Sequence, residues 1–203
     1  MDELTAALLD DLDGAFPRLV DGHADRLYTI ALRVIGNPHD AEEVTQDALV
    51  RAYRALAGYD PQRIAAIDLR PWLTTVVLNA ARNRVRRRRP EVSLDHEPAA
   101  GRSAVPATDV REARAADGRP DHVALEREGA ARLAGALAQL PPRYRIPVVL
   151  RHIDGLSYAE MAAALGRPEG TLKAQVHRGL AMLRATLTDD PAHDRASTHG
   201  GVQ

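Results

Sequence analysis

The segment from Glu91 to about His122 constrains the fold more than any other part of this sequence. It mixes Pro, Gly, Ser, Asp and Arg, and it contains almost no large apolar residue and no clear apolar period. Such a stretch cannot bury enough surface to offset the entropy that ordering removes. The sequence therefore predicts a flexible linker over residues 90–122 between two compact units, at 1–89 and 123–187.

Both units are expected to be helical, because their apolar residues recur at spacings of three and four and no segment alternates convincingly with period two. In the first unit, a helix is expected to end at Gly36. The next helix should start at Asp40, where Glu43 would close a capping box. A third should begin near Pro71. We expect an all-α protein of two small helical domains, followed by a disordered tail over residues 188–203.

The end of the third helix is strongly basic: six of the eight residues from Arg82 to Arg89 are arginine, although the formal net charge of the chain is −1. At about 100° per residue, a polar stripe forms opposite the apolar face. It consists of Thr75, Asn79, Arg82, Asn83 and Arg86. Asn and Arg can make paired hydrogen bonds to base edges, and Arg neutralises phosphate. The alternative is a solvated helix end at the negative pole of the helix dipole, for which one or two arginines would suffice.

The second unit has the pattern of a helix-turn-helix. Ser157 and Glu160 predict a capping box, Gly166 ends the helix that follows, and a further helix starts after a short turn. Polar residues crowd the start of that last helix, as in a recognition helix that enters the major groove. A plain helical hairpin remains the alternative. Pro147, in the helix before this motif, is expected to lie within or just beyond a first turn.

Composition excludes several classes of function. Without cysteine the chain has no disulfide, thiolate zinc site or thiol redox switch. No apolar run approaches 18 residues, so we expect no membrane insertion and a cytoplasmic location. His193 and His199 predict no metal site, and no cofactor is expected. The stretch "RHIDGLS" brings together a His, an Asp and a Ser, but Ser157 is already used as a cap, so the protein is not expected to be an enzyme.

Three stretches together resemble a bacterial RNA polymerase sigma factor of the extracytoplasmic-function (ECF) group. They are "DAEEVTQDALVRAY" from Asp40, "RPWLTTVVLNAARNRVRRRR" from Arg70, and the region from Leu140 to Arg184. The resemblance implies contacts with the β′ clamp helices and β flap of core RNA polymerase, with promoter DNA and with an anti-sigma factor. The rival interpretation is an autonomous DNA-binding regulator, which leaves the polar stripe of the basic helix without a role.

The resemblance also implies roles for particular residues. The polymerase-binding candidates are Asp40, Glu43, Gln46 and Asp47. The candidates for the promoter −10 element, where the loop from Tyr59 to Leu69 would capture a flipped base, are Tyr59, Arg63, Trp72, Asn79, Arg82, Asn83, Arg86 and Arg87. The candidates for the −35 element are Thr171, Lys173, Gln175, His177 and Arg178.

Overall fold

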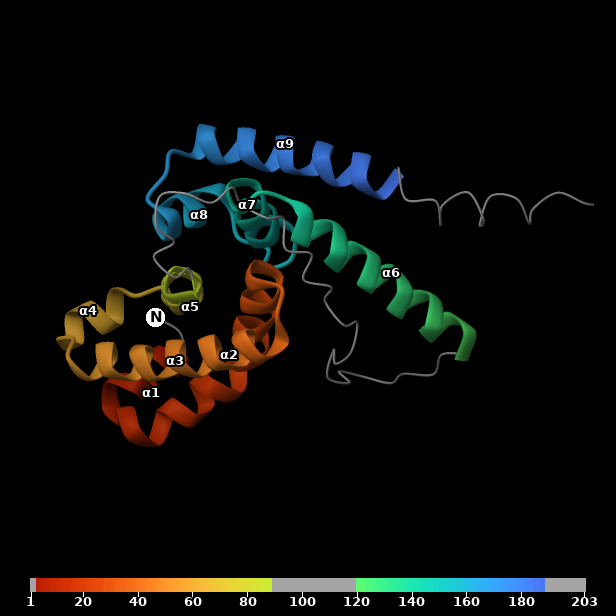
Figure 1. The fold of residues 1–203 in the computed structure, drawn as a ribbon. Helices are drawn as coiled ribbons and strands as arrows, with labels where there is room; N and C mark the ends of the chain where they lie inside the picture. The colour runs from red at the N-terminus through yellow and green to blue at the C-terminus, as the bar shows by residue number, and fades with distance from the viewer. Residues whose placement is uncertain (1–2, 89–119, 189–203) are drawn as a thin grey trace, which may run out of the picture.

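The computed structural model describes residues 3–88 and 120–188, and within these two ranges the regular structure is entirely α-helical (Figure 1). This confirms the all-α prediction. Most of the expected linker and nearly all of the expected disordered tail, with both of its histidines, lie outside the described residues. The helices are α1 (Glu3–Asp10), α2 (Leu12–Ile35), α3 (Pro38–Ala57), α4 (Pro61–Ala66), α5 (Leu69–Arg88), α6 (Pro120–Gln139), α7 (Pro142–His152), α8 (Tyr158–Leu165) and α9 (Glu169–Thr188).

The start of α3 differs from the sequence prediction. Gly36 does end α2 with a left-handed φ of 82°, but the next helix begins at Pro38, and the N-cap is Asn37. The Asn37 side chain accepts a hydrogen bond from the backbone N–H of Asp40 at 3.0 Å. The predicted capping box from Asp40 to Glu43 is therefore wrong. Proline suits a first helical position because it lacks the N–H that would have no partner there.

Proline also lies at or near the start of other helices. The expected loop after α3 contains α4, which starts at Pro61 after the N-cap Asp60, whose side chain accepts from the Arg63 N–H at 2.9 Å. The third long helix of the first unit, α5, begins at Leu69, slightly before Pro71. Likewise α6 begins at Pro120, inside the range expected for the linker.

Within the second unit the predicted capping box is confirmed. The Ser157 hydroxyl accepts from the Glu160 N–H at 3.2 Å, and the Glu160 carboxylate accepts from the Ser157 N–H at 2.6 Å. Gly166 ends α8 with φ of 63°. Pro147 agrees with the expectation, because it is buried at the sixth position of α7, just beyond the first turn. There it lacks the N–H that would otherwise bond one turn back.

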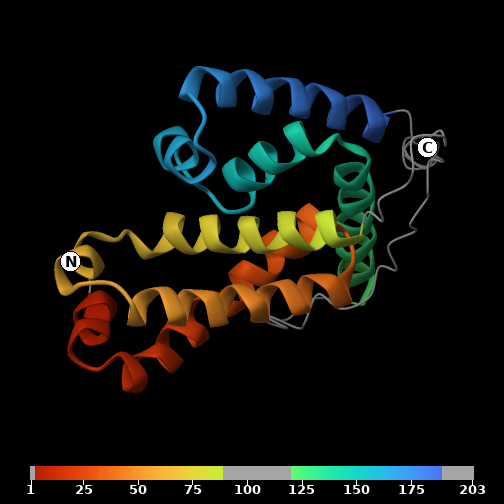
Figure 2. The same cartoon turned by 60° about the vertical axis from the view of Figure 1, so that its left-hand side comes forward.

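The first unit is built around three long helices. α2, α3 and α5 pack on one another, and α3 and α5 run antiparallel with α4 joining them at one end (Figure 2). Leu27 of α2, Ala48 of α3 and Leu73 of α5 are at most 1% exposed. The periodic apolar residues of the sequence are thus the ones that form this core.

The two units pack against each other and share one core, which the sequence did not indicate. Leu150, Leu156 and Met161 of the second unit belong to the same buried cluster as the residues of α2, α3 and α5. α8 packs on α5, and α7 packs on α2, while α9 lies on the far side from α3 (Figures 1 and 2). A smaller cluster around Leu137 and Val149 lies between α6, α7 and α9.

Candidate nucleic-acid interface

Helix α5 has three sides with different neighbours. Leu73, Val77 and Ala80 are buried against the first unit. Thr74, Leu78 and Ala81 are also buried, on the adjacent side of the helix where α8 packs. The remaining side is open, and it carries the predicted polar stripe. Asn79, Arg82, Arg86 and Arg87 are exposed there, and Asn83 and Thr75 are partly exposed.

The open side of α5 presents cationic groups and amides to solvent. One hydrogen bond links two of its members, from Arg82 Nη1 to Asn79 Oδ1 at 3.1 Å. This bond holds the guanidinium beside an amide, and both groups can donate to a base edge or a phosphate. The arrangement suits recognition of nucleic acid along the helix.

Arg84, which lies in the same basic cluster, has a different role. It donates through Nε and Nη2 to the Asp40 carboxylate at 3.1 and 2.9 Å, and it also pairs with Glu43. The Asp40 side chain is only 1% exposed. Arg84 therefore joins α5 to α3, and Asp40 belongs to this internal contact instead of the exposed face where a partner could reach it.

The other predicted polymerase-binding residues lie on the outer side of α3. Gln46 and Asp47 are exposed, and Asp47 pairs with Arg51 one turn later at 2.8 Å. Glu43 is 41% exposed while it holds Arg84. Val50, an apolar residue on the same helix, is 47% exposed. This face combines acidic, amide and apolar groups and has room for a partner.

An aromatic cluster occupies the end of the first unit, where α4 meets α5. The Tyr59 and Trp72 rings meet edge to face, with centroids 6.3 Å apart, and both are partly buried. The Arg63 guanidinium lies 3.7 Å above the centroid of the Tyr59 ring. Aromatic faces and guanidinium planes are the groups on which an unstacked base can stack. The structure thus brings together the three residues predicted from the loop and the helix start.

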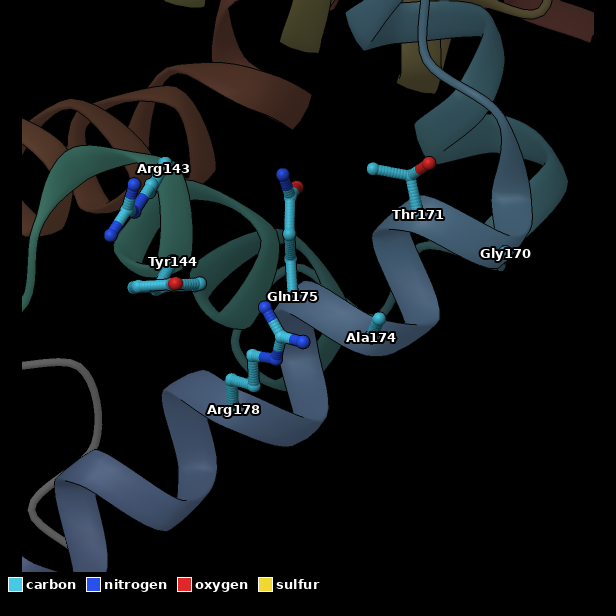
Figure 3. A pocket seen from close by; sticks show the side chains of 7 residues that line it. All are labelled: Arg143, Tyr144, Gly170, Thr171, Ala174, Gln175 and Arg178. Atoms are coloured by element: carbon cyan, nitrogen blue, oxygen red, sulfur yellow. The ribbon is translucent and has the colours of Figure 1, made fainter.

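The start of α9 lines a hollow of about 490 Å³ together with α7 (Figure 3). The predicted residues Thr171, Gln175 and Arg178 all line it. Lys173 and His177 do not, because they project from the other side of α9. Lys173 pairs with Glu169 at 3.7 Å and lies 5.5 Å from the centre of the Tyr158 ring.

Sequence reasoning missed the α7 side of this hollow, which Arg143 and Tyr144 form. The Arg143 guanidinium lies 4.7 Å from the centre of the Tyr144 ring. The only signal in the sequence was a cation next to an aromatic residue at the beginning of a helix. It could not be assigned to the site before the packing of α7 on α9 was known. With Arg178, Arg143 gives the hollow cationic groups on both of its helices.

Comparison with known proteins identifies the family. The model of Sigma-70 region 2 matches residues 19–91, and that of Sigma-70 region 4 matches residues 130–183. The ECF RNA polymerase sigma factor SigE of Mycolicibacterium smegmatis is 35% identical over 192 residues, which cover 92% of this chain and 69% of the relative. The chain belongs to the ECF RNA polymerase sigma factors. Another ECF sigma factor, SigW of Bacillus subtilis, is 32% identical over 176 residues, 86% of this chain and 90% of SigW.

Solved structures agree with this sigma factor fold. CnrH, in complex with the cytosolic domain of CnrY, is 29% identical with a TM-score of 0.62, covering 92% of this sigma factor and 96% of CnrH. The sigma factor RpoE of Bartonella quintana, solved in complex with the anti-sigma factor NepR, has the same TM-score at 21% identity. The match covers 86% of this chain and 98% of RpoE, and at this identity it supports the fold alone. In the described part of the sigma factor, no helix is long and apolar enough to cross a membrane.

Proposed function

We propose that this sigma factor binds core RNA polymerase and directs promoter-specific initiation, with α5 at the −10 element and α9 at the −35 element. One observation carries the proposal. Each of the two matched regions presents cationic and amide groups to solvent on a single helix. In the first region these groups lie along the open side of α5, and in the second they lie at the start of α9. Two such surfaces suit two promoter elements, and the proposed action is binding, without a catalytic step of its own.

At the −10 element, the open side of α5 would hold the separated strand while the aromatic cluster receives a base. Unstacking a base costs a few kcal/mol. Stacking on an aromatic side chain contributes about 1–3 kcal/mol per base, so Tyr59 and Trp72 can recover much of that cost. Asn79, Arg82 and Asn83 would supply hydrogen bonds, and Arg86 and Arg87 would neutralise phosphates.

At the −35 element, α9 would enter the major groove with the hollow facing the DNA. Thr171, Gln175 and Arg178 would contact bases and phosphates, and Arg143 would add a phosphate contact from α7. Lys173 and His177, from the other side of α9, would contact the backbone at the edge of the groove. This arrangement supports specific recognition because the amide and guanidinium groups converge on one hollow.

For core polymerase, we propose that the outer face of α3 meets the β′ clamp helices and that the second unit meets the β flap. Gln46, Asp47 and the exposed part of Glu43 would form the α3 contact, and Asp40 is left out because it is buried. An anti-sigma factor is a further proposed partner. It is supported by the 29% identical CnrH, which was solved in complex with a protein partner, the cytosolic domain of CnrY.

In vitro transcription with purified core polymerase tests the proposal most directly. The protein should confer discrete start sites on a genomic template library, each preceded by two elements whose centres lie about 25 base pairs apart. A double variant that carries both Arg82→Ala and Arg86→Ala should reduce initiation at every such promoter at least tenfold. Arg18→Ala removes a similar exposed charge elsewhere and should leave initiation unchanged.

A second variant separates the two surfaces. Thr171→Ala with Arg178→Ala should reduce initiation most at promoters with a strong −35 element and least on templates whose −10 region is already melted. If the protein with core polymerase produces no start sites beyond those of core polymerase alone, the proposed function is wrong.

A further inference from the structure

The contact between the two units contains a buried ionic cluster, which the proposed DNA and polymerase surfaces do not use. Asp154 lies in the turn between α7 and α8, and its side chain is 0% exposed. Its Oδ1 accepts a hydrogen bond from Arg26 Nη1 of α2 at 2.6 Å, and its Oδ2 lies 3.1 Å from the Thr74 hydroxyl of α5. Both partners belong to the other unit.

The surrounding bonds hold the same groups in place. Arg26 also donates through Nη2 to the Arg70 carbonyl at 2.9 Å, and Arg70 Nη2 donates to the backbone carbonyl of Asp154. Arg70 Nη2 lies 3.9 Å from Asp154 Oδ1, which adds a second cation. We call Asp154, Arg26, Arg70 and Thr74 the Asp154 cluster.

The Asp154 carboxylate has no described partner within its own unit. Its backbone N–H donates to the Val149 carbonyl at 3.0 Å, and this bond holds the turn whatever the side chain is. A carboxylate buried without a cation would be strongly unfavourable, so this side chain has two acceptable environments. One is the paired environment between the units, and the other is water after the units separate.

We propose that the Asp154 cluster is a latch that holds the two units of the free protein closed and that opens when the sigma factor binds core polymerase. An ion pair of this kind suits a reversible contact, because the cost of desolvating both charges offsets much of their attraction. Arg26 Nε adds to that cost, since it is buried without a hydrogen-bond partner in the structure. The cluster is therefore specific in its geometry, and its small net contribution adds to the apolar contacts that the two units also share.

Opening is required if the proposed function holds. Centres about 25 base pairs apart along a duplex are separated by about 85 Å at roughly 3.4 Å per pair. In the closed state α8 packs directly on α5, and α9 lies one helix layer away from it. A closed molecule therefore cannot place α5 and α9 on both elements at once. The latch would compete with polymerase binding and keep the free protein from engaging a whole promoter.

Energy transfer between two dyes on the full-length protein tests the latch. The chain has no cysteine, so Ala57→Cys on α3 and Ala181→Cys on α9, both at exposed positions, give two unique labelling sites. Transfer should be high for the free protein and should fall when core polymerase is added. Asp154→Asn should lower transfer without polymerase, with at least a tenfold rise in the ratio of open to closed molecules.

Matched variants make the result specific. Asp25→Asn makes the same chemical change at an exposed position beside Arg26 and should leave transfer unchanged. Arg26→Gln removes the partner from the other unit and should open the protein as Asp154→Asn does, and the double variant should open it no further. If Asp154→Asn loses its helical circular dichroism, Arg26→Gln provides the same comparison.

Two results would overturn the latch: low transfer in the free wild-type protein, or a folded Asp154→Asn and Arg26→Gln that both stay as closed as wild type. A third result would separate the two halves of the inference. If the variants open the free protein but bound core polymerase leaves wild-type transfer unchanged, the Asp154 cluster closes the free protein, but neither its opening on core polymerase nor the spanning of a promoter in the open state holds.

Discussion

The arginines at the end of α5 perform different tasks because successive residues point in different directions. Arg84 turns toward α3 and holds Asp40, whereas Arg82 and Arg86 point to solvent. The sequence showed an unusual density of positive charge and predicted the polar stripe correctly by helical geometry. It could not identify the partner of Arg84, because Asp40 is 44 residues away and had been assigned to a different surface.

Replacement of Arg84 should therefore affect folding more than DNA binding. Arg84→Ala removes the guanidinium from a buried carboxylate, a change that costs about 3–5 kcal/mol when both partners are buried. Because the Arg84 side chain is 32% exposed, we expect a loss of about 2–3 kcal/mol in the free energy of unfolding, measured by urea denaturation. Arg82→Ala should change it by less than about 0.5 kcal/mol. Equal losses for both variants would contradict the division of roles.

The exposed arginines should instead determine the salt dependence of promoter binding. Each phosphate contact that a protein loses reduces the slope of log K against log salt by about 0.7–0.9. We expect Arg82→Ala and Arg86→Ala to lower that slope by about this amount each, measured for the protein bound to core polymerase on promoter DNA. A variant that weakens binding equally at all salt concentrations would show that its arginine makes no phosphate contact.

At the scale of the helices, the sequence predicted helix ends best where one residue type is strongly preferred for a particular backbone conformation. Gly36 and Gly166 end helices with positive φ, and Ser157 with Glu160 forms a capping box, as predicted. Helix starts at proline were less predictable. Pro38 cannot continue the preceding helix, but proline is also favourable at the first position of the following helix, and Asn37 supplies the cap. Local sequence allows both outcomes.

The capping box should make α8 sensitive to pH. Hydrogen bonds from Ser157 lower the pKa of Glu160 in the folded protein. A carboxyl with a depressed folded pKa stabilises the fold above its unfolded pKa, and that contribution is lost as pH falls through the folded pKa. Ser157→Ala should cost about 1 kcal/mol at pH 7, and the difference from wild type should narrow below about pH 4 in urea titrations.

Glu160→Gln provides the control for this effect. The glutamine side chain can still accept a hydrogen bond from the Ser157 N–H, but it cannot titrate. The free energy of unfolding of this variant should therefore lack the contribution that wild type loses when Glu160 is protonated. If wild type and Glu160→Gln lose stability in parallel as pH falls through this range, the pH dependence comes from other groups.

The packing of α7 against α9 depends on the absence of a side chain at Gly179. A Cβ at that position would lie 2.6 Å from Val148 Cγ2 and 3.3 Å from the Tyr144 carbonyl. Gly129 in α6 has nothing within 4 Å of the same point. Gly129→Ala should raise stability by about 0.8–1 kcal/mol through helix propensity. The free energy of unfolding of Gly179→Ala, measured by urea denaturation, should be about 1–3 kcal/mol lower than that of Gly129→Ala because of overpacking. Equal effects of the two changes would mean that α7 and α9 separate freely.

For the whole molecule, the sequence predicted two units but not that they share a core. The apolar period identifies which side of a helix is buried and does not identify the neighbour. Leu78 and Ala81 lie beside the face of α5 that packs on the first unit, and only the packing of α8 explains their burial. The same limit applies to Asp154, whose partners Arg26 and Thr74 are 128 and 80 residues away. No local signal distinguishes it from an ordinary turn aspartate.

The closed arrangement predicts how DNA binding depends on polymerase. Without core polymerase, the protein should bind a full promoter no more tightly than a fragment with only a −35 element, because one closed molecule reaches one element. With core polymerase, the full promoter should bind at least tenfold more tightly than that fragment in a gel-shift titration. Equal affinity for the full promoter with and without core polymerase would contradict this account.

Two sides of α5 pack against neighbouring helices. Substitutions that change promoter preference are therefore confined to the third, solvent-exposed side of this helix. A substitution at Leu73 or Leu78 alters the assembly of the protein before it alters base recognition. Substitutions at Asn79, Arg82 and Arg86 are free of that penalty. Related proteins that have diverged in their target sites should therefore differ along this narrow strip of helix and keep its other two sides nearly unchanged.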